Sequence, residues 1–415
     1  MRTKKLNLFI CLGTYILSYV LFSFPALAAL PIGDRWAGNL IISPQTQLKV
    51  QFNFAENANG DYNVTLDSPD QGAFGLKGVV NLLTPDSVNI AFSDLSIRYA
   101  ASVYNTPDGN FLYGTFRQAH LSLPLIMKQE AKSLKRPQEP IPPFPYQTRE
   151  VTFRNEIDDV TLAGTLILPQ DYYEDTPVVV LVSGSGLQNR DEEIFEHKPF
   201  AVIADHLARV GIATLRYDDR GFGESTGDAS HATTLDFARD AAAAVDFVRD
   251  SLKIRKVGML GHSEGATIAF MLAAGDDSPD FVIGLGTPAA RGEDILYDQL
   301  CYAAGPDGAK DTLERTRRQE NPWMQWFLEY NPVHDLMKLH VPALAIYGSN
   351  DRQVSPKLNV PILEAAAPSV EVKVYPGLNH LLQHSETGDP SEYYKITETI
   401  SPEVLLDIVR FIREN

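Results

Sequence analysis

Over the last two thirds of the chain, short apolar runs alternate with amphipathic stretches, and this alternation constrains the fold more than any other feature. The apolar runs have the length of strands buried on both faces; they occupy residues 176–182, 211–217, 257–260, 281–285, 343–347 and 371–375. Between them, residues 200–210 and 235–251 have the periodicity of amphipathic helices. Strands that alternate with helices predict an α/β domain built on a mostly parallel, doubly wound sheet. Residues 152–168, with a turn near Asp158, predict a leading antiparallel hairpin.

A different pattern precedes this α/β region. Between Trp36 and Lys128, apolar and polar residues alternate with a period of two, which is typical of strands with one buried face. Turn-forming sequences interrupt the alternation; they lie at residues 57–60, 84–86 and 107–110. We therefore expect residues 29–135 to form a small antiparallel barrel or sandwich of about six to eight strands. Its aromatic side chains are expected in the core rather than on a ligand-binding surface.

A proline-rich segment separates the two regions. Five prolines fall within nine residues, from Pro137 to Pro145. Proline removes a backbone donor and favours a stiff, extended chain. We therefore place a linker at residues 136–147, between the small β-domain and the α/β domain at residues 148–415. A rigid strap packed along one domain would mark the same junction.

The first 28 residues have the composition of an export signal. A basic start is followed by an apolar run from Leu6 to Phe24, and Ala26-Leu27-Ala28 then supplies the small residues that signal peptidase accepts. We expect residues 1–28 to be cleaved and the mature protein to be periplasmic or secreted, without stable membrane insertion. A retained membrane anchor is the alternative, because the apolar run is almost long enough to span a bilayer.

Charge and cysteine content argue against several classes of function. The chain has 36 Lys and Arg against 53 Asp and Glu, a formal charge of −17, which becomes −20 when the three basic residues of the signal are lost. Such a surface repels phosphate backbones, so nucleic acid is not an expected partner. Two cysteines, Cys11 and Cys301, cannot build a zinc cluster or a disulfide scaffold. The histidines show no paired metal spacing, so we expect no metal.

The strongest chemical signal is the sequence Gly261-His262-Ser263-Glu264-Gly265, which lies between a predicted buried strand and an alanine-rich helix. A sharp strand-to-helix turn can hold a serine hydroxyl above the edge of a sheet. The crowded backbone there favours glycine two residues to either side of the serine. We therefore predict that Ser263 is a nucleophile.

A serine nucleophile needs a base to take its proton and a carboxylate to orient that base. In a sheet of this kind the acid and then the histidine follow the serine along the chain. Asp351 and His380 each follow a predicted strand, so both are expected at the carboxyl edge of the sheet with Ser263. We predict a catalytic triad of Ser263, Asp351 and His380, with His384 as the alternative base.

Two backbone N–H groups are candidates for stabilising the oxyanion of acyl transfer. One belongs to Glu264, the residue after the nucleophile. The other is assigned to Ser185 in the Ser-Gly-Ser-Gly loop at residues 183–186, which follows a predicted strand. This loop lacks the third glycine of a dinucleotide-binding fingerprint, so we expect no cofactor.

Three further segments are given bracing or covering roles. Residues 189–193 and 218–225 combine arginine with carboxylates and are expected to brace the rim of the site rather than to react. Residues 288–340 form an insertion between two sheet strands, and they include Trp323 and Trp326. We expect this insertion to be a helical lid over the site, although packing into the core would also explain its aromatic residues.

With these motifs in view, residues 148–415 resemble the α/β-hydrolase superfamily. Within it they are similar to bacterial serine esterases that share three loops, here at residues 183–192, 219–225 and 261–265. Leu187 departs from the plainest pattern, in which a proline is common at that position. The resemblance implies hydrolysis of carboxylic esters through an acyl-enzyme, without a cofactor. The region 29–135 resembles β-domains that precede exported hydrolases, and that likeness implies no activity.

We therefore predict an exported serine esterase that acts on small carboxylic esters. Ser263 would attack the carbonyl, His380 would carry the proton, and Asp351 would orient the imidazole. A serine peptidase or aminoacyl-amide hydrolase of the same fold is the nearest alternative, because the same triad cleaves amides. A non-catalytic protein that holds a ligand in its β-domain is the third possibility. The sequence makes no prediction of oligomeric state.

Overall fold

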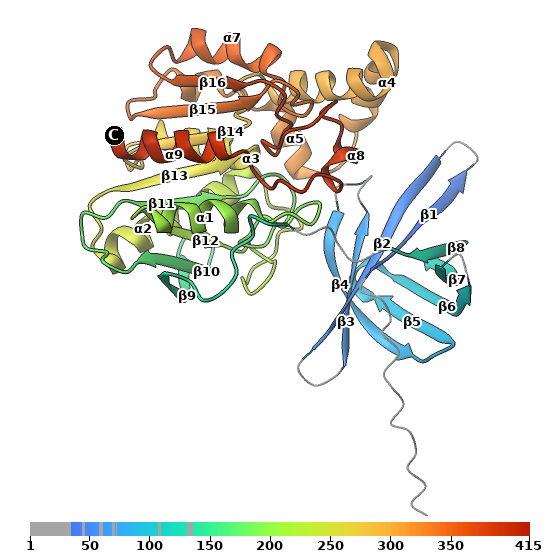
Figure 1. Ribbon diagram of the computed structural model, residues 1–415. Helices are drawn as coiled ribbons and strands as arrows, with labels where there is room; N and C mark the ends of the chain where they lie inside the picture. The colour runs from blue at the N-terminus through green and yellow to red at the C-terminus, as the bar shows by residue number, and fades with distance from the viewer. Residues whose placement is uncertain are drawn as a thin grey trace, which may run out of the picture. The chain divides into compact units, whose positions relative to one another are not determined.

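The computed structural model describes two compact units, Met1–Lys132 and Ser133–Asn415 (Figure 1). The described residues are 35–43, 46–57, 61–68, 71, 73–106, 109–130 and 136–415. The predicted export signal at residues 1–28 lies outside these ranges. Within them, no helix combines the length and the apolar character that crossing a membrane requires.

The first unit is a closed barrel of eight antiparallel strands, as the alternating pattern predicts. Its strands are β1 (Arg35–Ser43), β2 (Thr46–Glu56), β3 (Tyr62–Ser68), β4 (Ala73–Leu83), β5 (Ser87–Phe92), β6 (Ile97–Thr106), β7 (Gly109–Gln118) and β8 (Leu121–Gln129). Pairing of β1 with β8 closes the barrel. Gly38 is needed at this seam, because a Cβ there would lie 2.2 Å from the Ile126 carbonyl oxygen.

Large apolar side chains fill the barrel. Alternate residues point inward, and most of the aromatic residues expected in the core lie there, among them Phe52 and Tyr99, which are fully buried. Tyr113 is an exception: it follows the buried Leu112, so it faces the other way, and it is 46% exposed. The Tyr99 hydroxyl lies 3.0 Å from the Leu125 carbonyl oxygen, which gives this buried polar atom a partner.

The proline-rich segment packs along the second unit as a strap. Arg136 donates through Nε to the carbonyl of Glu196, at 3.1 Å. Gln138 donates to the carbonyl of Ile400 at 2.7 Å and accepts from the N–H of Thr399 at 2.6 Å. The residues on either side of Pro137 therefore fix the start of this stiff segment to the second unit by hydrogen bonds.

The second unit is built on an eight-stranded sheet with the order β16-β15-β14-β13-β11-β12-β10-β9. The strands are β9 (Tyr146–Asn155), β10 (Val160–Pro169), β11 (Val178–Val182), β12 (Ala213–Tyr217), β13 (Val257–His262), β14 (Val282–Leu285), β15 (Ala343–Gly348) and β16 (Glu371–Tyr375). Strand β10 runs antiparallel to β9 and β12, and the pairs from β12 to β16 are parallel. The predicted doubly wound, mostly parallel sheet with a leading hairpin is confirmed.

Helices cover both faces of this sheet (Figure 1). One face packs against α1 (Pro199–Arg209) and α9 (Pro402–Glu414), and the other against α2 (Thr234–Leu252), α3 (Glu264–Ala273) and α7 (Pro356–Ala366). Within β11, Val178, Val180 and Val182 join one apolar cluster, whereas Val179 and Leu181 join the other. Both faces are buried, which explains why the strand reads as an unbroken apolar run.

The insertion between β14 and β15 is helical, as expected. It consists of α4 (Gly292–Thr316), α5 (Pro322–Glu329) and α6 (Val333–Leu336). Helix α4 is broken at Gly305, which has a non-helical φ of 71°. The next residue is Pro306, and a proline inside a helix disrupts it. A further short helix, α8 (Pro390–Tyr393), precedes α9.

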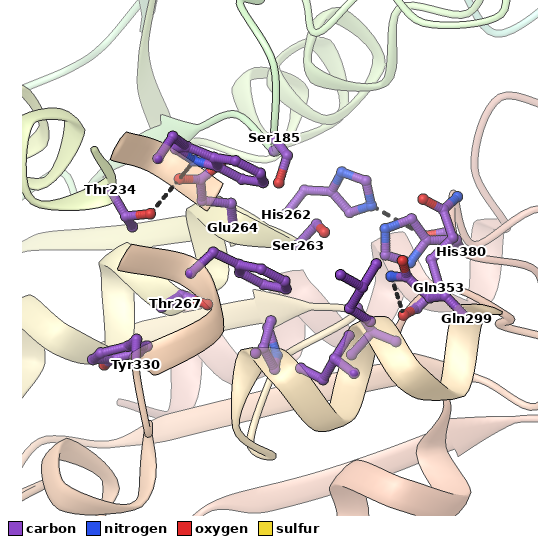
Figure 2. A pocket seen from close by; sticks show the side chains of 18 of the residues that line it. Ser185, Thr234, His262, Ser263, Glu264, Thr267, Gln299, Tyr330, Gln353 and His380 are labelled. Carbon is purple, nitrogen blue, oxygen red and sulfur yellow. Dashed lines mark hydrogen bonds between the residues drawn. The ribbon is translucent and has the colours of Figure 1, made fainter. Parts of the chain in front are cut away.

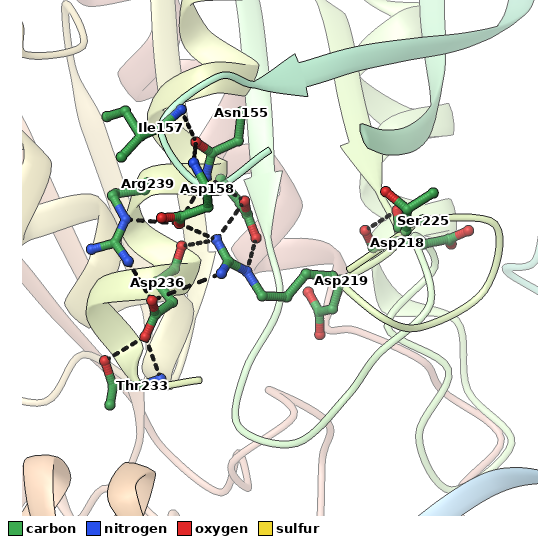
Figure 3. A network of polar contacts seen from close by, with 12 residues as sticks. Asn155, Ile157, Asp158, Asp218, Asp219, Ser225, Thr233, Asp236 and Arg239 are labelled. Atoms are coloured by element: carbon green, nitrogen blue, oxygen red, sulfur yellow. Dashed lines mark hydrogen bonds and ion pairs between the residues drawn. The ribbon is translucent and has the colours of Figure 1, made fainter. Parts of the chain in front are cut away.

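A buried arginine braces α2 against the leading hairpin (Figure 3). Arg220 donates to both carboxylate oxygens of Asp240, at 2.6 and 2.8 Å, and to Asp158 at 2.8 Å. Arg239 shares the same Asp158 oxygen at 2.8 Å, and these two guanidinium groups lower the pKa of Asp158 to about 2. Residues 218–225 were expected to brace the rim of the site, but the arginine of that segment takes its partners from α2 and the hairpin instead.

Candidate active site

Ser263 occupies a strained turn between β13 and α3. Its φ of 53° and ψ of −115° lie outside the regions that residues with side chains prefer. A Cβ on Gly261 would lie 2.0 Å from the Gly265 carbonyl oxygen, and a Cβ on Gly265 would lie 2.0 Å from the Val182 carbonyl oxygen. Both glycines are therefore required by backbone crowding, and the turn exposes Ser263 at the carboxyl edge of the sheet.

Asp351 and His380 form a buried pair at the same edge. Asp351 follows β15 and His380 follows β16, and their side chains lie 2.8 Å apart, Oδ2 to Nδ1. The other carboxylate oxygen of Asp351 accepts the backbone N–H groups of Gln353 and Val354, each at 2.8 Å. The carboxylate is thus fixed by three donors and holds the proton of His380 on Nδ1, which leaves Nε2 as an acceptor.

The structure brings two of the three predicted residues to one cavity. Ser263 and His380 both line a cavity of about 230 Å³ (Figure 2). Asp351 does not line it but is hydrogen-bonded to His380. His384, the alternative base, is instead bonded to Glu398 at 2.9 Å, with a side chain that is 61% exposed. His380, and not His384, is therefore the histidine that lines the cavity with Ser263, and the triad remains a prediction.

The loop after β11 is held in place by two buried carboxylates. Asp219 accepts the Ser183 hydroxyl at 2.9 Å and the Gln188 N–H at 2.7 Å. Burial raises the pKa of Asp219 well above its usual range, although these two donors act in the opposite direction. The N–H of Gly184 is engaged by Glu192 at 2.7 Å. The next N–H along the loop, that of Ser185, remains our predicted oxyanion donor.

The second predicted oxyanion donor is the N–H of Glu264, the first residue of α3. The first N–H groups of a helix have no partner inside the helix, and the helix dipole favours negative charge there. Together with the Ser185 N–H, this group would face an oxygen that develops charge beside Ser263. Both oxyanion donors remain predictions.

The insertion supplies most of the apolar wall of the cavity. The wall residues contributed by α4 and α5 are Ile295, Leu296, Trp323, Met324, Trp326 and Phe327. The Trp323 and Phe327 rings are stacked at 5.4 Å between centroids. Helices α4 and α5 therefore lie where a lid is expected, and their aromatic residues face the cavity.

The side chain of Glu264 was not singled out by the sequence. Its Oε1 atom accepts the Thr234 hydroxyl at 2.6 Å and the Trp323 indole N–H at 2.7 Å, and the Ser185 hydroxyl is a third donor. Burial raises the pKa of Glu264. This one carboxyl group thus joins α2, α5 and the loop after β11 to the helix that carries the nucleophile (Figure 2).

The loop at residues 189–193 is hydrogen-bonded, as expected. Arg190 contacts Asp218 through Nη2 at 2.8 Å and Glu224 at 2.7 Å. Its guanidinium therefore joins this loop to the loop after β12 and braces the rim of the site. Among the described residues, no group of three or more His, Cys, Asp or Glu side chains could hold a metal ion.

Comparison with known proteins agrees with this geometry. Residues 196–291, which include Ser263, match the family model described as serine aminopeptidase, S33. The chain is also 29% identical over 291 residues to esterase EstD of Thermotoga maritima, a match that covers 65% of this chain and 69% of EstD. The second unit has the predicted α/β-hydrolase fold. The predicted enzyme class, a hydrolase, is confirmed.

Two further comparisons give weaker similarity. A monoglyceride lipase homolog of Monkeypox virus is 22% identical over 229 residues, covering 51% of this chain and 82% of that protein. The solved structure of Est1E from Butyrivibrio proteoclasticus with bound ferulic acid is 19% identical and covers 64% of this chain and 98% of that one, with a TM-score of 0.49.

Proposed function

We propose that this protein is a serine esterase that cleaves small carboxylic esters through an acyl-enzyme. The observation that carries the proposal is the buried Asp351–His380 pair at the cavity that also exposes Ser263 in its strained turn. The similarity to esterase EstD supports a carboxylic ester as the substrate.

The proposed reaction needs only groups that this chain supplies. Ser263 Oγ attacks the ester carbonyl carbon while its proton passes to His380 Nε2, and Asp351 stabilises the resulting imidazolium. The N–H groups of Glu264 and Ser185 stabilise the oxyanion. The alcohol then leaves with the proton from His380. A water molecule next gives its proton to His380 and attacks the acyl carbon, and return of that proton to Ser263 releases the acid.

The cavity supports a small acyl group. Its volume of about 230 Å³ lies below the range of about 300–1,000 Å³ that is usual for sites of drug-sized ligands. Its walls from α4 and α5 are apolar and aromatic. A short chain or a single ring would fit this space better than a long fatty acyl chain.

An aminoacyl amide is the second candidate substrate. The family model that matches residues 196–291 is described as serine aminopeptidase. The same nucleophile, base and oxyanion donors can act on an amide, so the two candidates differ in the leaving group and in what the cavity binds.

A substrate panel tests the proposal. We expect purified protein to hydrolyse nitrophenyl acetate and nitrophenyl butyrate with higher kcat/KM than nitrophenyl palmitate or aminoacyl nitroanilides. Ser263→Ala should remove ester hydrolysis, because no other group on the wall is an activated nucleophile in the proposed mechanism. Hydrolysis of anilides alone would overturn the ester assignment. Ester hydrolysis that survives in Ser263→Ala would overturn the nucleophile.

We also propose that the enzyme is exported, on the basis of the basic start, the apolar run and the Ala26-Leu27-Ala28 site. The full chain expressed in a bacterium should yield a mature protein that begins at Ala29. Sequencing of the amino terminus measures this directly. Recovery of only uncleaved chain in the membrane fraction would favour the retained anchor instead.

A further inference from the structure

A second buried pair of side chains lies beside the proposed base, on the same cavity. His262, the residue before the nucleophile, places Nδ1 2.9 Å from Glu192 Oε1 and Nε2 3.1 Å from the backbone carbonyl oxygen of His380. The rings of His262 and His380 are 4.7 Å apart between centroids. His262, Glu192 and His380 are 6%, 2% and 3% exposed, so these contacts are shielded from water.

Both ring nitrogens of His262 face acceptors. A neutral imidazole has one N–H, so it could donate to only one of the two oxygens. The carbonyl of His380 can only accept, so the proton of that contact must be on Nε2. A second proton must lie between Nδ1 and Glu192. Since Glu192 Oε1 also accepts the Gly184 N–H at 2.7 Å, the arrangement fits a carboxylate beside an imidazolium.

We propose that His262, doubly protonated beside Glu192, is a positioning residue for the reaction. Its Nε2–H fixes the backbone of His380, and Glu192 fixes Gly184 in the loop that carries the predicted oxyanion donor Ser185. The pair therefore ties the base and the oxyanion loop to the residue next to the nucleophile. This inference rests on the proposed ester hydrolysis, and it assigns His262 no contact with the reacting atoms.

The charges around His262 set its response to pH. The titratable groups that face it are Glu192, His380 and Asp351. Burial by itself lowers the pKa of His262, but the carboxylate of Glu192 and the bond to the His380 carbonyl outweigh burial, and the pKa is raised. Because this pKa is raised, His262 carries both protons at pH values below about 6.5, the ordinary pKa of histidine. It loses the second proton as the pH rises through the raised value.

The inference predicts a falling alkaline limb in the rate profile. Activity falls when His262 loses the second proton and releases either Glu192 or His380. His262→Gln can still place an amide N–H near the His380 carbonyl, but an amide does not titrate. We expect this variant to lose about tenfold to 100-fold in kcat with little change in KM, because Glu192 loses its imidazolium partner and the oxyanion loop that it holds is misplaced, which costs rate rather than binding.

The decisive measurement is kcat against pH for nitrophenyl acetate in three variants. His262→Gln should abolish the alkaline limb, and Glu192→Gln should move it to lower pH, because the imidazolium loses its carboxylate. His384→Gln is the matched control: it removes a histidine that also bonds a glutamate at 2.9 Å, but on the surface, and should leave the profile unchanged.

The possible results separate this inference from the proposed function. An alkaline limb that persists unchanged in both His262→Gln and Glu192→Gln overturns the positioning role. Loss of ester hydrolysis in Ser263→Ala alongside that result would leave the esterase proposal standing. If His262→Gln does not fold, as judged by its thermal unfolding, the shift of the limb in Glu192→Gln decides the question, with no shift counting against the inference.

Discussion

Asp351→Asn is expected to lower kcat for ester hydrolysis by about 10⁴-fold, with little change in KM or in fold. The N–H groups of Gln353 and Val354 both donate to one oxygen of Asp351 and would hold the new amide oxygen in that place. The amide NH₂ would then face His380 Nδ1, where the carboxylate now accepts. A donor at that position favours the tautomer with its proton on Nε2, which cannot take a proton from Ser263.

Steady-state kinetics with nitrophenyl acetate at several pH values measure this effect. Asp389→Asn is a suitable control, because Asp389 is also an aspartate that accepts a backbone N–H, that of Ser391, but it caps α8 and is 40% exposed. Its kcat should match that of the parent enzyme. A kcat for Asp351→Asn within tenfold of the parent would contradict the role given to this carboxylate.

The sheet could be predicted because each of its strands is marked by a pattern of neighbouring residues in the sequence. Each central strand is buried on both faces, so its apolar run is visible in the sequence. Strand β16 has the predicted bounds 371–375, but it is an edge strand and its side chains are only partly buried, which corrects the expectation of burial on both faces. The positions of Ser263, Asp351 and His380 follow from the same logic, since each comes directly after a parallel strand and such strand ends meet at one edge. Their chemical roles then depend on side-chain geometry.

The supporting contacts could not be predicted, because they join residues that are distant in the chain. Glu192 and His262 are 70 residues apart, and Trp323 and Glu264 are 59 apart. Glu192, His262 and Glu264 do lie within the motifs that the esterase resemblance rests on, and this was the available signal. Periodicity says which face a residue occupies but not which atom it contacts, so these side chains could be given no partner.

The same limit explains the arginine of residues 218–225. Its neighbours in the chain, Asp218 and Asp219, are the nearest carboxylates in sequence, yet Arg220 pairs with Asp240 and Asp158. Asp218 instead takes Arg190 from another loop, and Asp219 takes backbone and hydroxyl donors. The residue types indicated that this segment forms ion pairs. Which residues pair depends on the loops that the topology brings together.

Gly265→Ala is expected to lower the stability of the protein sharply. A Cβ there would lie 2.0 Å from the Val182 carbonyl oxygen and 2.6 Å from the Ser183 carbonyl oxygen, and backbone of β11 and its loop cannot move aside as a flexible side chain could. Overpacking of a core costs about 1–3 kcal/mol and occasionally more, against a total stability of about 5–15 kcal/mol. Thermal unfolding and soluble yield of the full chain measure the loss.

Gly275→Ala provides the matched control, because it adds the same methyl group just beyond the other end of α3. The nearest atom to a Cβ at that position is the Leu272 carbonyl oxygen at 3.4 Å, an ordinary contact distance, so stability should change by less than about 0.5 kcal/mol. If Gly265→Ala unfolds at the same temperature as Gly275→Ala, that result contradicts the close packing of the start of α3 against the end of β11. Any Gly265→Ala protein that does fold should still lose ester hydrolysis, because the methyl group displaces the loop that presents Ser185 to the oxyanion.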